Sequence, residues 1–127
     1  FVKRAIVPEA GSTYLLPRSV GVHKAKELMF FGDAFDAKKA FELGLVNKVL
    51  PAEELMTEAK KAAEKLAKAP PLSLKLMKKM INNQLRDHIS HALDLENEGL
   101  HETMSSADFF EAIMAFNEKR EPVFRGE

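Results

Sequence analysis

Two histidines and an aspartate are spaced so that their side chains could bind a metal ion together. His88, His91 and Asp94 lie three residues apart, so on a helix they would face roughly one direction, as the ligands of a metal ion must. A structural zinc site takes four ligands, and nothing else in the sequence completes this set. We therefore predict surface histidines and no metal site.

A second candidate is Glu9, which directly follows Pro8 and stands just before the helix expected after Gly11. A carboxylate can move protons, but an acid at a helix start more often stabilises the helix dipole. From the residues alone, we favour that structural role for Glu9.

Charge and cysteine content exclude several other chemistries. Lysine plus arginine equals aspartate plus glutamate at 19 each, so no overall field attracts nucleic acid or an anionic membrane. Lys75, Lys78 and Lys79 form a basic cluster, which acids downstream balance, so we interpret it as a solvated helix face. The sequence has no cysteine and no phosphate-binding glycine loop, which excludes thiol chemistry and fits a reducing compartment such as the cytoplasm.

The chain has 127 residues, enough for one small domain. No apolar stretch approaches the roughly 20 residues of a membrane-spanning helix, and no signal segment opens the sequence. We therefore predict no membrane contact. The sequence starts at Phe1 within an apolar and basic segment, which suggests a fragment.

Short elements are expected to position these residues up to Pro51. We predict an extended lead-in over residues 1–7, then short helices over residues 14–20, 22–31 and 37–43, with stops at Gly21, Gly32 and Gly44. The β-favouring run at residues 45–50 predicts the one strand.

Beyond Pro51 the pattern is helical. A helix from residue 52 should end before Pro70, and a longer one should carry an apolar stripe, which consists of Leu74, Met77, Ile81, Leu85, Ile89, Ala92 and Leu95. A last helix around residues 109–116 has Ser105 or Ser106 as its cap. The chain is therefore expected to be mostly α, with amphipathic helices that bury their stripes against each other or another subunit.

The sequence resembles the crotonase (enoyl-CoA hydratase/isomerase) family over nearly its whole length. The matching residues are Ile6 to Thr13, Leu15 to Arg18, Val20-Gly21, Ala25, Glu27-Leu28, Gly32-Asp33, Ala37, Ala40, Gly44 to Val46, Val49 and Pro51, then Glu111 to Ile113, Ala115-Phe116, Glu118 to Arg120, Pro122 and Phe124. The resemblance implies the carboxy-terminal part of the α/β crotonase (ClpP/crotonase-like) fold. Residues 1–51 would end the crotonase core, and residues 52–127 would form a helical region for subunit packing and CoA contacts.

The family's chemistry gives Glu9 a second interpretation. Crotonases hold the thioester oxygen of an acyl-CoA with two backbone amides while carboxylates move protons. The hydratases place a glutamate seven residues before the proline matched by Pro8, where this sequence has Phe1. Glu9 matches instead the acid of the 3-enoyl-CoA to 2-enoyl-CoA isomerases, so the resemblance reverses our preference and implies that Glu9 is catalytic.

The resemblance also suggests substrate contacts. Candidate apolar walls for the acyl chain are Tyr14, Leu15, Leu16, Met29 and Phe30. Phe116 and Lys119 match positions near the adenine and phosphates of CoA, although helical spacing alone would make Phe116 core and Lys119 a solvated charge. CoA is part of the substrate, and no separate cofactor is expected.

We therefore expect an enzyme that shifts a double bond in an enoyl-CoA, with one glutamate as proton shuttle. The amides for the thioester oxygen belong to an amino-terminal half that this chain lacks, so the chain alone would be an incomplete catalyst. The family implies a homotrimer or hexamer. The alternatives are an enoyl-CoA hydratase, which is a lyase, and a helical assembly module without chemistry.

Overall fold

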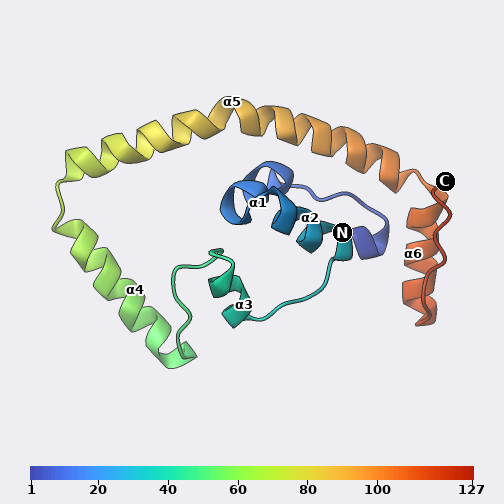
Figure 1. Cartoon of the computed structure of the whole chain (residues 1–127), viewed down its shortest axis with the longest axis horizontal. Helices are drawn as coiled ribbons and strands as arrows, with labels where there is room; N and C mark the ends of the chain where they lie inside the picture. Colours follow the sequence, from blue (N-terminus) through green and yellow to red (C-terminus); the bar gives the residue numbers. More distant parts are fainter. The chain divides into compact units, whose positions relative to one another are not determined.

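A computed structural model describes the backbone of residues 1–127 and every side chain except that of Asp87. Figure 1 shows the elements in chain order. They are the 3-10 turn η1 (Val2–Arg4) and the helices α1 (Ser12–Val20), α2 (Val22–Phe31), α3 (Ala37–Glu42), α4 (Ala52–Ala67), α5 (Pro71–Met104) and α6 (Ala107–Glu118). The prediction of a mostly α chain is confirmed.

Helix ends lie where the sequence carries the expected caps. Gly32 ends α2 with φ of 60°, a left-handed conformation that glycine adopts without steric cost. The Asp36 carboxylate accepts a hydrogen bond of 2.8 Å from the Lys39 amide and starts α3. Ser106 caps α6 in the same way, accepting from the Phe109 amide at 3.1 Å.

The chain divides into two compact units, each described by itself. Unit 1 comprises Phe1–Phe35 and His88–Glu127, and unit 2 comprises Asp36–Asp87. In unit 1, α1 packs against α2, and η1 contacts both α2 and α6. The buried apolar residues there are Tyr14, Ala25, Ala112 and Ala115, a very small core.

Unit 2 has no fully buried residue among the side chains that the structure describes. Exposed fractions are 57% for Leu55 and Leu66 on α4 and 61% for Ile81 on α5. Leu55 and Leu66 lie on one face of α4 at helical spacing, and Ile81 belongs to the apolar stripe predicted for the longer helix. These side chains find no covering surface within this unit, and burial of the stripes against another subunit stays a prediction.

Two local predictions are wrong. Residues 45–50 form no strand, and no strand occurs anywhere in the described backbone. A single β-favouring run needs a second strand to satisfy its amides and carbonyls, and this chain supplies none. The lead-in is not extended throughout, because residues 2–4 form η1, which closes with a 3.0 Å hydrogen bond from the Ala5 amide to the Val2 carbonyl.

No described helix combines the length and apolar character that a bilayer crossing requires. The functional division at residue 51 stays a prediction.

Candidate functional site

Glu9 lies in a tight turn that leads into α1. Its carbonyl oxygen accepts hydrogen bonds from the Ser12 amide at 3.2 Å and from the Ser12 hydroxyl at 2.7 Å. Ala10 and Gly11 are both left-handed, with φ of 61° and 75°. The turn thus reverses the chain between Glu9 and the first residues of the helix.

The Glu9 side chain is exposed, and its carboxylate is available to a ligand. Among the side chains that the structure describes, none forms an ion pair or hydrogen bond with its carboxylate. The carboxylate that bonds the first amides of α1 belongs to another residue, Glu96. Glu9 itself forms no hydrogen bond to these amides through its carboxylate.

Glu96 is a site residue that the sequence analysis missed. It lies on α5 and is only 4% exposed. Its carboxylate accepts hydrogen bonds of 2.7 Å from the Gly11 and Thr13 amides, and a third from the Thr13 hydroxyl. Burial raises the pKa of Glu96, but the bonds from Thr13 and Gly11 outweigh burial and hold it below the usual value, so this carboxylate is ionised.

A signal for Glu96 was present in the sequence. Leu85, Ile89, Ala92 and Glu96 follow one another at helical spacing, so the acid continues the apolar stripe of α5. A charged residue in such a stripe is buried only when hydrogen-bonded or paired. The spacing identifies the stripe, but it does not reveal that the partners are 83 and 85 residues away.

An apolar cavity of about 220 Å³ opens beside the turn within unit 1. It is lined by Phe1, Val2, Pro8, Ser12, Leu16, Leu28, Met29, Gly32 and Phe35. Pro8 and Ser12 bring the lining close to Glu9 in the chain. Phe1, which the sequence analysis matched to the hydratase glutamate position, forms part of the wall.

The structure brings together two of the five candidate wall residues, Leu16 and Met29. Tyr14 is buried elsewhere in unit 1, stacked on His88 with ring centroids 6.1 Å apart and covered by the Arg18 guanidinium at 3.3 Å. Leu15 and Phe30 are 39% and 67% exposed and line no part of this cavity.

A larger cavity of about 590 Å³ in unit 1 contains none of the predicted site residues. Ala5, Ile6 and Val7 line it together with residues from the end of α5 and the carboxy-terminal tail. Asp108, one of its acids, is already bonded to tail amides. Of these two cavities, only the smaller one, beside the turn of Glu9, contains residues predicted for the site.

Phe116 and Lys119 lie at the carboxy-terminal end of α6. The Phe116 ring is 66% exposed, and the Arg4 guanidinium carbon lies 4.7 Å from its centroid. Lys119 is exposed and adopts φ of 55° where the helix ends. Both side chains are accessible to a ligand.

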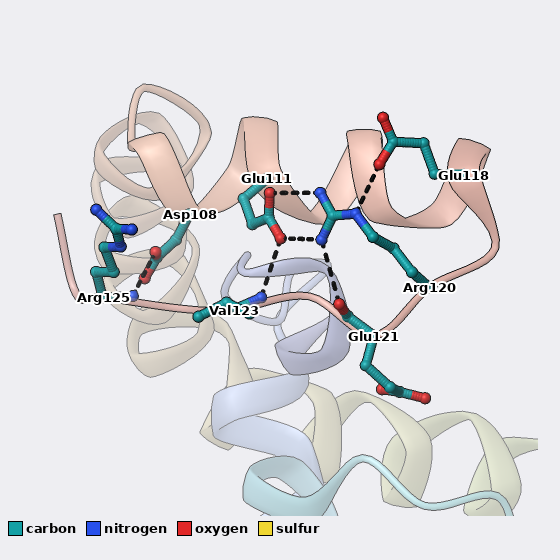
Figure 2. A network of polar contacts seen from close by, with 7 residues as sticks. All are labelled: Asp108, Glu111, Glu118, Arg120, Glu121, Val123 and Arg125. Atoms are coloured by element: carbon teal, nitrogen blue, oxygen red, sulfur yellow. Dashed lines mark hydrogen bonds and ion pairs between the residues drawn. The ribbon is translucent and has the colours of Figure 1, made fainter.

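A polar network holds the tail along α6 (Figure 2). Arg120 donates to Glu111 at 2.9 Å and to Glu118 at 2.6 Å, and the Val123 amide donates to Glu111 at 3.0 Å. Closer to the helix start, the Asp108 carboxylate accepts from the Arg125 and Gly126 amides at 2.7 and 2.8 Å. The acids on one face of α6 thus bind the backbone of the last residues.

This network predicts a pH dependence for the tail. The hydrogen bonds from Arg120 and then Val123 lower the pKa of Glu111 from 4.5 to about 2. Because the folded-state value is the lower one, the contribution of the network is complete above about pH 4.5 and is lost as the pH falls through about 2. We expect an NMR titration of the Glu111 carboxyl in the intact protein to show this low midpoint, and Arg120→Gln to move it upward. An ordinary midpoint in the unsubstituted protein would contradict the contacts.

For metal binding, the described side chains offer no group of three or more acids, histidines or cysteines placed around one point. His88, which the sequence analysis weighed as a ligand, stacks on Tyr14.

Comparisons with known proteins cover the whole chain. The family model described as enoyl-CoA hydratase/isomerase matches residues 1–127. The chain is 41% identical over 115 residues to a short-chain-enoyl-CoA hydratase of Clostridium acetobutylicum, covering 91% of this chain and 44% of that protein. It is 35% identical over 127 residues to the 1,2-epoxyphenylacetyl-CoA isomerase of Escherichia coli, covering 100% of this chain and 48% of that protein.

Solved structures agree with the sequence comparisons. An enoyl-CoA hydratase/isomerase from Pseudoalteromonas atlantica T6c superposes with a TM-score of 0.90 and is 37% identical, covering 98% of this chain and 50% of that one. The chain therefore spans about half the length of the relatives it matches.

Proposed function

The chain belongs to the enoyl-CoA hydratase/isomerase family, and from this premise we propose that the protein shifts a double bond in an enoyl-CoA with Glu9 as the single proton shuttle. The observation that carries the proposal is the uncommitted Glu9 carboxylate, in a turn whose neighbours Pro8 and Ser12 line an apolar cavity. A shuttle must reach substrate, and Glu9 has no competing partner among the described side chains.

Phe1 supports isomerisation over hydration. Adding water across the double bond in the family's manner takes two glutamates, and one of those positions matches Phe1. Phe1 lines the cavity, and its side chain cannot accept a proton. An apolar wall here would exclude water from the acyl chain, which favours proton transfer by a single base.

In the proposed reaction, the Glu9 carboxylate removes a proton from the carbon alpha to the thioester. The electron pair delocalises into the carbonyl as a dienolate, whose oxygen the family holds with two backbone amides from its amino-terminal half. The protonated Glu9 then returns the proton to the gamma carbon, and the double bond moves into conjugation. Glu9 ends the cycle as a carboxylate, so no other reactant is consumed.

The contacts proposed for the rest of the substrate use two half-buried groups in the cavity and two exposed groups on α6. Leu16 and Met29 would contact the acyl chain inside the cavity. The Phe116 face is accessible to an adenine, and Lys119 could pair with a phosphate as a point charge. We also propose that the protein assembles as a homotrimer or hexamer and acts in the cytoplasm.

Hydration is the second candidate, because a relative that is 41% identical is named a short-chain-enoyl-CoA hydratase. The intact protein separates the two when it is given a 3-enoyl-CoA and, in another assay, a 2-enoyl-CoA. We expect the absorbance of the conjugated thioester to grow with the first substrate and to stay constant with the second. Rapid loss of that absorbance with the 2-enoyl-CoA, without turnover of the 3-enoyl-CoA, would favour the hydratase.

A further inference from the structure

Glu96 is the one buried charged residue among the described side chains, and the proposed reaction does not use it. It lies on α5 in unit 1, close to the turn that carries Glu9. Burying a carboxylate is unfavourable unless hydrogen bonds replace its water. What Glu96 binds therefore indicates what it does.

Both carboxylate oxygens of Glu96 bond to the turn. Oε2 accepts from the Gly11 amide at 2.7 Å, and Oε1 accepts from the Thr13 amide at 2.7 Å and from the Thr13 hydroxyl. The Ser12 amide, between these two donors, is bonded to the Glu9 carbonyl. Three successive amides thus have acceptors: those of Gly11 and Thr13 bond to the Glu96 carboxylate, and that of Ser12 bonds to the Glu9 carbonyl.

The backbone next to the amides that Glu96 binds is in an unfavourable conformation. Ala10, directly after Glu9, has φ of 61°, which a residue with a Cβ rarely adopts. Such residues persist where surrounding contacts hold them. Helix α5 also packs closely here, since a Cβ added to Gly11 would lie 3.1 Å from the Ile89 side chain. The turn therefore depends on α5 for its shape.

We infer that Glu96 is a positioning residue for the proposed reaction, fixing the turn of residues 9–13 so that the Glu9 carboxylate is directed at the substrate carbon. The inference rests on the proposed function of Glu9. The hydrogen bonds from Thr13 and Gly11 hold the pKa of Glu96 below its usual value, which favours the carboxylate form that accepts from all three donors.

The test is Glu96→Gln in the intact protein. Glutamine has the same size, but its amide nitrogen cannot accept from the donors that face it. We expect kcat for isomerisation to fall about 10- to 100-fold per folded active site, with KM little changed, because small misplacement of a reacting group lowers the rate that much. Glu98→Gln, an exposed acid two residues along the same helix, is the matched control and should keep wild-type kcat.

A double-mutant cycle shows whether Glu96 acts through Glu9. If it does, Glu96→Gln should lower kcat in the unsubstituted protein but cause no further loss when Glu9→Gln is already present. Wild-type kcat in a folded Glu96→Gln protein, while Glu9→Gln abolishes activity, would overturn the positioning role alone. Wild-type kcat in Glu9→Gln would instead overturn the proposed function.

A milder variant serves if Glu96→Gln does not fold. Thr13→Val removes only the hydroxyl bond and leaves both amide bonds to Glu96 in place. We expect a several-fold lower kcat with unchanged KM and a circular dichroism spectrum like that of the unsubstituted protein. An unchanged kcat in this variant would overturn the inference.

Discussion

Glu9→Gln in the intact protein is expected to lower kcat for enoyl-CoA isomerisation by about 10²- to 10⁴-fold, the usual contribution of a positioned general base. Glutamine cannot take the alpha proton, and no other described acid lies in the turn or lines the cavity beside it. The exposed Glu9 side chain makes no described contact, so stability should change by no more than about 0.5 kcal/mol. Absorbance of the conjugated thioester measures the rate.

Glu53→Gln is the matched control for this prediction, because Glu53 is also an exposed acid near a helix start. It should leave kcat unchanged. A Glu9→Gln protein that isomerises at the wild-type rate, with folding and assembly intact, would remove the catalytic assignment. A helical assembly module would become the better interpretation if the unsubstituted protein also turned over neither enoyl-CoA.

Gly32→Ala should lower the free energy of unfolding of the intact protein by about 2 to 4 kcal/mol. Gly32 has φ of 60°, and a left-handed conformation costs a residue with a Cβ about 1 to 2 kcal/mol. The added Cβ would also lie 2.8 Å from Cγ1 of Val2, and such overpacking typically costs a further 1 to 3 kcal/mol. Urea unfolding at fixed protein concentration gives the difference.

Gly44→Ala separates the two causes. Gly44 has a similar φ of 74°, but a Cβ there would meet nothing within 4 Å. It should therefore show the backbone penalty alone and a smaller loss of stability. Equal losses for the two variants would mean that the close approach of Val2 to a Cβ at Gly32 adds no cost beyond the backbone penalty.

The helices were predictable because their signals are local. Gly21 and Gly32 mark helix ends, Pro71 begins α5, and Ser106 caps α6 through the Phe109 amide, one of the two serines expected to do so. Each of these depends on a residue's own backbone preference or on a partner three or four residues away. These four boundaries need no knowledge of the rest of the fold.

The errors come from features that depend on distant residues. The run at residues 45–50 has β-favouring side chains, but strand formation requires a partner strand. In the candidate site, the candidate wall residues Leu16 and Met29 line one cavity with Pro8, whereas Tyr14 packs against His88 on α5. The resemblance names Tyr14 as a candidate wall residue, but the sequence does not say which surface Tyr14 packs against.

The bond from Glu96 to Gly11 joins residues 85 positions apart, and this separation has a kinetic consequence. Closing so long a loop has an entropic cost, which must be met before the contact stabilises anything. While the chain is being synthesised, the turn around Glu9 leaves the ribosome long before the acid that holds it. The local shape at Glu9 is therefore completed late in folding, after α5 has formed and docked.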